Sequence, residues 1–198
     1  MKVTTMEPVV VHLSRVETPV GAMVVGATGD GVCMLEFADR SAPQQEARAS
    51  RLATRFRWVF AQGVNDVSRA MAAELEAYFA GRLREFTTPV SPTGTPFQQR
   101  VWASLRRIRF GETRSYTAQA ELAGVPAAVR AVARANGQNR IAIAIPCHRV
   151  VGADGSLTGY GGGVWRKEWL LRHEGVLPAP ARARRRRPVI DDENLSLF

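Results

Sequence analysis

The chain has 198 residues, of which 45% are hydrophobic, so it is long enough for one large domain or two small domains that share an interface. No apolar run could cross a bilayer, and residues 1–10 lack the features of a secretory signal, so we expect a cytosolic protein without membrane contact. The formal net charge of +9 stays positive without the five arginines at positions 182 and 184–187, which favours nucleic acid as a partner.

Cysteine and histidine are rare in the chain. The two cysteines are Cys33 and Cys147, and the histidines show no CxxC or paired-ligand spacing. A disulfide scaffold or a structural zinc site is therefore not expected, and the default interpretation of either cysteine is a small buried residue.

The first third of the chain predicts β structure. Three Val-rich stretches, Val9–Val16, Val20–Ala27 and Val32–Phe37, are separated by turn sequences and predict an antiparallel meander. Cys33 falls on the third stretch, where core packing is the expected role.

Two helices are predicted next. Ser41 can cap one over residues 44–52, and Asn65 or Asp66 can cap the other, Val67–Ala80. Apolar residues at three- and four-residue spacing on the second helix predict a core stripe, which consists of Met71, Leu75, Tyr78 and Phe79.

A polar, turn-rich stretch at residues 91–94 predicts a domain boundary. We therefore expect an α+β protein with an N-terminal β-rich domain over residues 1–92 and a mainly helical C-terminal domain over residues 93–177. Residues 178–198 are Pro-, Ala- and Arg-rich, then acidic, and predict a disordered tail.

The C-terminal domain begins with a strong helix signal, in which Thr95 and Gln98 form a capping box around Pro96. Helices over Thr117–Leu122 and Pro126–Ala135 flank a tight turn, the punctuation of a helix-turn-helix. Alternating Ile and Ala at 141–145 predicts a short strand, and Trp165–Arg172 predicts the last helix.

Cys147 and His148 are adjacent, directly after the predicted strand. A cysteine is a nucleophile only as thiolate, which a neighbouring base makes available. Adjacent side chains of an extended segment point to opposite faces, so a bridging water would have to complete the contact, and Glu174 could orient the histidine ring. The adjacency alone is a weak signal, and an inert buried cysteine would be the better interpretation of it.

The surrounding sequence changes that balance. The motifs occur in a fixed order and are Gly94–Trp102, Gly111–Thr113, Ser115–Tyr116, Arg130–Val132, Asn139, Ile145–Val150 and Lys167–Leu171. Together they resemble the O6-alkylguanine-DNA alkyltransferases, also called methylated-DNA–protein-cysteine methyltransferases. The detailed resemblance covers residues 94–175, and the β-rich first half is similar to the family's less specific N-terminal domain.

The resemblance implies DNA repair by irreversible transfer of an alkyl group from O6-alkylguanine to the protein's own Cys147, without cofactor or metal, and it leaves open whether O4-alkylthymine is a second substrate. His148, through a water, and Glu174 would deprotonate Cys147, and Tyr116 would protonate the departing guanine. Asn139 would brace the turn before the active-site strand.

The resemblance also implies contacts to double-stranded DNA. Arg130 would enter the duplex in place of the extruded base, Tyr160 would wall the base pocket, and backbone groups of Cys147, Val150 and Gly161 would recognise guanine. The complete set of expected DNA- and substrate-binding residues is Ser115, Ala127, Arg130, Ala131, Asn136, Val150, Tyr160, Gly161 and Lys167.

The helix that carries Arg130 is rich in alanine, at positions 127, 128, 131, 133 and 135. Short side chains would let a helix dock in the narrow minor groove. The alternative is that these alanines are helix formers packed on a neighbour, which must hold for one face. The chain departs from the common family pattern at Ala133, Arg140 and Gly161, where Gly, Pro and Ser are frequent, and none of these changes removes a chemical group from the mechanism.

Two other function classes remain as alternatives: a non-catalytic DNA-binding module of the same fold, against which Cys147 argues, and a helix-turn-helix transcription regulator, which needs no Cys-His-Glu set. The final residues, Asn194–Phe198, are similar to peptides by which bacterial repair proteins bind the replication sliding clamp, although Gln is preferred where Asn194 stands. A solvated tail with accidental leucines is an equal interpretation. We expect a monomer.

Overall fold

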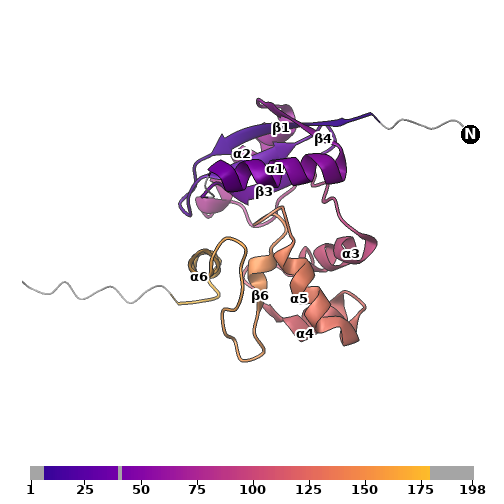
Figure 1. Ribbon diagram of the computed structural model, residues 1–198. Coiled ribbons are helices and arrows are strands. Elements are labelled where there is room, and N and C mark those ends of the chain that lie inside the picture. Colours follow the sequence, from indigo (N-terminus) through magenta and orange to yellow (C-terminus); the bar gives the residue numbers. More distant parts are fainter. Residues whose placement is uncertain (1–6, 40–41, 179–198) are drawn as a thin grey trace, which may run out of the picture.

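The computed structural model describes residues 7–39 and 42–178, and it consists of a sheet-containing N-terminal half and a mainly helical C-terminal half (Figure 1). The predicted α+β fold class is confirmed. No helix within the described ranges is long and apolar enough to cross a membrane. The predicted disordered tail beyond Pro178, with its proposed clamp peptide, lies outside the described residues.

The N-terminal sheet has four strands in the order β3-β2-β1-β4. The strands β1 (Val9–Val16), β2 (Met23–Ala27) and β3 (Val32–Phe37) form the predicted antiparallel meander. The fourth strand, β4 (Trp58–Gln62), was not predicted and pairs parallel to β1, so the sheet is mixed. A parallel partner requires a crossover connection, which helix α1 provides.

Helices α1 (Ala42–Phe56) and α2 (Asp66–Phe79) cover opposite faces of this sheet (Figure 1). Asn65 caps α2 in a capping box with Ser68, as the sequence predicts for this position. The predicted core stripe is confirmed for Met71, Leu75 and Tyr78, which are fully buried. The predicted cap of α1, Ser41, lies outside the described residues.

The C-terminal half begins with α3 (Pro96–Leu105), whose predicted Thr95–Gln98 capping box is present. The predicted helix-turn-helix consists of α4 (Tyr116–Leu122), the 3₁₀ turn η1 (Pro126–Ala128) and α5 (Val129–Gly137). A small core holds this unit together through four buried residues: Val101, Ala120, Val132 and Ala135.

The predicted strand at residues 141–145 is wrong. The segment is a series of turns in which Ile143 has a φ of 70°, and only an isolated bridge joins Ile141 to Leu35 of β3. The three isoleucines are nevertheless buried. Large apolar side chains at every second position can thus be buried by a compact turn as well as by a strand, and the sequence pattern does not separate the two.

The chain then forms the 3₁₀ turn η2 (Cys147–Arg149), the strand β6 (Val150–Val151), which pairs with β5 (Arg114–Ser115), and the last helix α6 (Val164–His173). One hydrophobic core joins both halves, because residues of β2, β3 and α2 pack with residues of α3, the 141–145 turns and α6. The site described next lies where these elements meet.

Candidate active site

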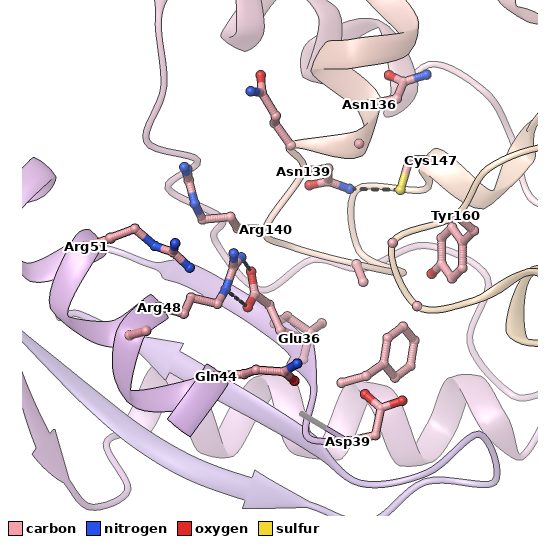
Figure 2. Close-up of a pocket in the computed structure, with 18 residues that line it drawn as sticks. Glu36, Asp39, Gln44, Arg48, Arg51, Asn136, Asn139, Arg140, Cys147 and Tyr160 are labelled. Carbon is pink, nitrogen blue, oxygen red and sulfur yellow. Dashed lines mark hydrogen bonds and ion pairs between the residues drawn. The ribbon is translucent and has the colours of Figure 1, made fainter. Parts of the chain in front are cut away.

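Cys147 begins the 3₁₀ turn η2, which follows the turns of residues 141–145 after Pro146. Its Sγ accepts a hydrogen bond from Asn139 Nδ2 at 3.3 Å, and the residue lines two cavities (Figure 2). Burial raises the pKa of the Cys147 thiol, although the Asn139 hydrogen bond and the charge of Lys167 act in the opposite direction. The sulfur is therefore a thiol at neutral pH and needs a base to become a nucleophile.

His148 has the properties of that base. The ring is fully buried, and Nε2 lies 2.9 Å from Glu174 Oε1. Nδ1 is buried without a hydrogen-bond partner among the described residues. Burial lowers the pKa of His148 against the opposing effect of Glu174, so the ring is neutral at pH 7. Because Nε2 must donate to the carboxylate, Nδ1 has a free lone pair that can accept a proton.

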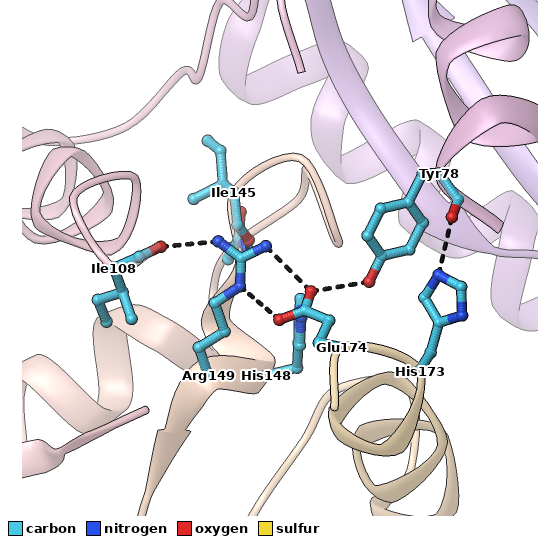
Figure 3. Close-up of polar contacts among 8 residues, drawn as sticks. Tyr78, Ile108, Ile145, His148, Arg149, His173 and Glu174 are labelled. Atoms are coloured by element: carbon cyan, nitrogen blue, oxygen red, sulfur yellow. Dashed lines mark hydrogen bonds and ion pairs between the residues drawn. The ribbon is translucent and has the colours of Figure 1, made fainter. Parts of the chain in front are cut away.

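Glu174 follows helix α6 and is held by more partners than the sequence predicts (Figure 3). It accepts hydrogen bonds from Arg149 Nε at 2.9 Å and Arg149 Nη2 at 3.0 Å, in addition to the contact with His148. Burial alone would raise the pKa of Glu174, but His148 and Arg149 outweigh it and lower the pKa to about 2. The carboxylate is thus permanently ionised at physiological pH.

Arg149 itself is a site residue that sequence reasoning left without a role. Its Nη1 donates to the Ile108 carbonyl at 2.7 Å, which fixes the guanidinium against the C-terminal half (Figure 3). Its position beside Cys147 and His148 was the available signal, because a buried arginine needs an acid nearby.

Asn139 makes the bracing contacts that the sequence analysis expects. Its Nδ2 donates to the Ile145 carbonyl at 2.8 Å, and its Oδ1 accepts the Ile141 amide at 3.0 Å. These bonds fix the turns before Cys147. The additional contact with the sulfur was not foreseen, because it depends on the turn conformation of residues 141–145 and not on an extended strand.

The smaller of the two cavities, of about 470 Å³, opens beside the helix-turn-helix. Its lining includes Tyr116, Ala133, Cys147, Tyr160 and Gly161. The Tyr116 hydroxyl lies 3.5 Å from the Thr158 carbonyl, and the Tyr160 hydroxyl is buried without a hydrogen-bond partner in the described part of the chain. The cavity therefore offers aromatic walls and hydroxyl groups next to the sulfur.

The larger cavity, of about 930 Å³, lies between the two halves (Figure 2). Cys147, Ala142 and Gly161 line it from the C-terminal half, whereas Phe37 and Arg51 line it from the N-terminal half. The cysteine is thus reached from two sides.

The predicted DNA-contacting face of α5 is exposed. Arg130, Ala127 and Ala131 are exposed, whereas Val132 and Ala135 are buried. Ala127 and Ala131 are therefore available for docking in a groove, whereas Ala135 packs on neighbouring helices. Arg130 forms no ion pair or hydrogen bond with the described residues. Ser115 caps α4, with Oγ accepting the Ala118 amide at 3.1 Å.

Lys167 is not placed to contact DNA, which corrects the expectation. The side chain is fully buried, and its ammonium donates to the carbonyls of Val150 at 2.6 Å and Thr158 at 2.8 Å. It ties β6 to the loop before Tyr160.

Asn136 also differs from the expectation of a DNA contact. Its amide exchanges two hydrogen bonds with Gln119, at 2.6 and 3.0 Å, and the side chain is buried. This paired amide joins α4 to α5, so Asn136 stabilises the helix-turn-helix. It still borders both cavities.

Cys33 has the predicted core role. It is buried, and burial raises the pKa of its thiol to about 11. Within the described ranges, no group of three or more His, Cys, Asp or Glu side chains could hold a metal ion.

Comparisons with known proteins agree on one group. Residues 96–176 match the family model for the 6-O-methylguanine DNA methyltransferase DNA-binding domain, and residues 11–92 match the model for its ribonuclease-like domain. The chain is 42% identical over 164 residues to a methylated-DNA–protein-cysteine methyltransferase of Mycobacterium leprae, which covers 83% of this chain and 92% of the relative.

Solved structures give the same result. A crystal structure of Mycobacterium tuberculosis O6-methylguanine methyltransferase superposes with a TM-score of 0.69 at 41% identity, covering 86% of this chain and 96% of the other. A crystal structure of M. tuberculosis OGT in complex with DNA has a TM-score of 0.70 at 40% identity, covering 85% and 96% of the two chains.

Proposed function

The chain belongs to the 6-O-methylguanine DNA methyltransferase family, and we propose that Cys147 is the residue to which it transfers the alkyl group of O6-alkylguanine in DNA. The protein is a DNA repair enzyme of the methylated-DNA–protein-cysteine methyltransferase type. The observation that carries the assignment is that Cys147 lines a cavity beside α5 and is followed by His148, which is buried and hydrogen-bonded to Glu174.

The first step is removal of the Cys147 proton. His148 Nδ1 accepts it through a water molecule, and the imidazolium that forms is stabilised by the ionised Glu174 at Nε2. Asn139 and Lys167 stabilise the negative charge that develops on the sulfur. These groups offset the burial that otherwise keeps the thiol protonated.

The second step is a nucleophilic displacement at the alkyl carbon. A bond forms between Sγ and that carbon, the bond between the carbon and guanine O6 breaks, and its electron pair stays with the guanine. Tyr116 donates its hydroxyl proton to the departing base, which leaves as neutral guanine. The thioether on Cys147 has no easy route back to a thiol, so each molecule reacts once.

The alkylated base has to leave the duplex before it can react. The exposed small side chains of Ala127 in η1 and Ala131 in α5 allow close approach to the minor groove, and Arg130 fills the gap left by the flipped base. Tyr160 and the Gly161 backbone hold the base in the smaller cavity. The DNA complex of the M. tuberculosis relative supports DNA as the partner.

The test is to incubate the protein with a short duplex that contains O6-methylguanine and to measure the masses of the intact protein and of its peptides by mass spectrometry. We expect the mass of one methyl group on the peptide that contains Cys147. Cys147→Ala should abolish transfer and keep DNA binding, because binding depends on phosphate and groove contacts.

Cys33→Ala is the matched control, since it removes the other buried thiol without touching the cavity. It should retain full transfer. Methylation of the Cys147→Ala variant would overturn the assignment. The same experiment separates the enzyme from a non-catalytic damage binder or a transcription regulator, neither of which gains mass. We also propose that the protein acts as a monomer in the bacterial cytosol.

A second proposal concerns the tail. We infer from the sequence Asn194–Phe198 that three large apolar residues on a polar tail dock on the replication sliding clamp, while the arginines at 184–187 keep the tail near DNA. Deleting residues 194–198 should remove binding in a pull-down with purified clamp and leave transfer on short duplexes unchanged. Equal binding of the full-length and truncated proteins, or binding of neither, would refute the docking role and leave the transferase assignment intact.

A further inference from the structure

Tyr78 is a fully buried side chain of the N-terminal half whose hydroxyl is directed at the proposed relay (Figure 3). It lies on α2, and its hydroxyl donates a hydrogen bond to Glu174 Oε1 at 2.8 Å. The two residues are 96 positions apart in the chain. The contact therefore exists only because the two halves share one core.

The oxygen that Tyr78 contacts is the one that His148 uses. Glu174 Oε1 accepts from Tyr78 at 2.8 Å, from His148 Nε2 at 2.9 Å and from Arg149 Nη2 at 3.0 Å, whereas Oε2 accepts from Arg149 Nε at 2.9 Å. Three donors on one carboxylate oxygen share its charge. Each donor therefore weakens the hydrogen bonds that Oε1 accepts from the other two donors.

We propose that Tyr78 is a positioning residue that fixes Oε1 of Glu174 and moderates the basicity of His148, so that the N-terminal half takes part in activating Cys147. This proposal rests on the proposed function. Tyr78 touches neither the sulfur nor a reacting atom in this scheme. It acts only through Glu174.

The direction of the effect follows from charge. Without the phenol donor, Oε1 would carry more unshared negative charge and would stabilise the His148 imidazolium more strongly. The pKa of His148 would rise towards its usual value, from which burial has lowered it. Glu174 would remain ionised, because Arg149 still holds both of its oxygens.

Other groups near the relay are accounted for. His148 in η2 faces Glu174, which follows α6, and the positive charges of Arg149 in η2 and Lys167 in α6 lower the pKa of His148. The Tyr160 ring packs edge-on against the His148 ring, with 6.5 Å between the ring centroids, and Cys147 directly precedes His148 in the chain. His173 packs on the Tyr78 ring, and its Nε2 donates a hydrogen bond to the Tyr78 carbonyl at 2.7 Å. Tyr78→Phe leaves every one of these groups in place.

The test compares the full-length wild-type protein with Tyr78→Phe. The single-turnover rate of methyl transfer from a short duplex is measured against pH, and His148 is titrated by NMR. We expect the acid limb of the rate profile and the His148 titration to move together to higher pH by about half a unit or more in the variant.

Phe86→Leu is the control for packing. Phe86 lies 5.5 Å from the Tyr78 ring and has no hydrogen-bonding group, so its truncation should lower the melting temperature without moving the acid limb. A Tyr78→Phe profile that loses rate equally at every pH, with an unmoved His148 titration, would overturn the positioning role. Absence of methyl transfer by the wild type would instead refute the proposed function, so the two failures are distinguishable.

Discussion

At the scale of single residues, the two cysteines differ in exposure and in their neighbours, because Cys33 is buried and Cys147 is partly exposed. Desolvation nevertheless raises the pKa of both thiols. The thiol of Cys33 on β3 donates a hydrogen bond to the Gly26 carbonyl of the neighbouring strand β2 at 3.4 Å. The sulfur of Cys147 instead accepts a hydrogen bond from Asn139, and the residue borders two cavities. Reactivity at Cys147 is therefore a property of the groups around it.

One prediction tests the hydrogen bond to the sulfur. In the wild type, the hydrogen bond from Asn139 to the sulfur, at 3.3 Å, lowers the pKa of the Cys147 thiol, and Asn139→Ala removes this donor. The thiol pKa should rise by about one unit, and alkylation by iodoacetamide at neutral pH should slow about tenfold. Circular dichroism would establish whether the turn survives. An unchanged pH profile of alkylation in a folded variant would show that the contact does not stabilise the thiolate.

A second prediction concerns the pH dependence of transfer. His148 is neutral at pH 7 because its pKa is lowered below 6.5, and the pKa of Cys147 is raised above 9.0. Proton transfer within this pair makes the rate independent of pH between the two values. The single-turnover rate on a short duplex should stay flat from about pH 7 to 8.5 and fall only below pH 6.5. A tenfold rise per pH unit across neutrality would mean that His148 is not the base.

At the scale of elements, α5 shows how one helix serves both packing and recognition. Val132 and Ala135 are buried in the helix-turn-helix core, whereas Arg130 and Ala131 are exposed. Trp102 Nε1 donates to the Ala135 carbonyl at 2.8 Å, which fixes the helix against α3. A rigid helix with short exposed side chains can position one long cation accurately.

The corresponding prediction separates base flipping from chemistry. Arg130→Ala should slow transfer from duplex DNA at least tenfold and leave the reaction with free O6-methylguanine base unchanged, since a free base needs no flipping. Arg134→Ala removes the same charge from the exposed side of the same helix and serves as the control. Equal losses on duplex and free base would point to a role of Arg130 in folding or in the pocket.

Local sequence signals predicted most of the helices and strands, whereas elements that depend on contacts between distant residues were missed. The Thr95–Gln98 capping box and the Asn65 cap depend on residues three apart, and both are present. Strand β4 was missed because its pairing with β1 depends on a crossover through α1. The predicted strand at 141–145 is wrong because the Asn139 side chain accepts the Ile141 amide, and the carbonyls of Ile141 and Ala142 accept amides from within the same segment, which folds it into turns.

At the scale of the whole molecule, the site depends on both halves. The loop before α6 packs so closely on β3 that a Cβ at Gly162 would lie 2.3 Å from the Phe37 ring. Arg166 of α6 bonds Asp39 and the Gly162 carbonyl, each at 2.7 Å, and stacks on Phe37. The N-terminal half therefore shapes the loop that walls the cavity beside Cys147.

This arrangement explains which site features the sequence could predict. Cys147, His148 and Glu174 lie in or beside motifs and were expected together, and His148 does contact Glu174. Two further partners of Glu174 were not expected: Arg149, which lies in the Cys147 motif but was given no role, and Tyr78, whose spacing on α2 is that of an ordinary core residue. A buried hydroxyl acquires a partner only through tertiary packing, which spacing does not reveal.

The last prediction concerns the size of the alkyl group. A guanine in the smaller cavity places its alkyl group at Cys147, and the larger cavity of about 930 Å³ opens on the same residue. Larger groups can extend into it past Ala142 and Gly161, so the wild type should react with ethyl- and benzylguanine in DNA as well as methylguanine. Ala142→Leu should fill this space and slow transfer of benzyl at least tenfold more than transfer of methyl.

Ala72→Leu is the matched control, because it adds the same volume on α2 beside a separate groove lined by Pro19 and Phe79. It should leave the ratio of benzyl to methyl transfer at its wild-type value. The rates are best measured on one duplex sequence with each lesion, so that DNA binding is common to all of them. If Ala142→Leu slows both lesions equally, the larger cavity does not receive the alkyl group, and the tolerance for large groups must come from the smaller cavity walled by Tyr116 and Tyr160.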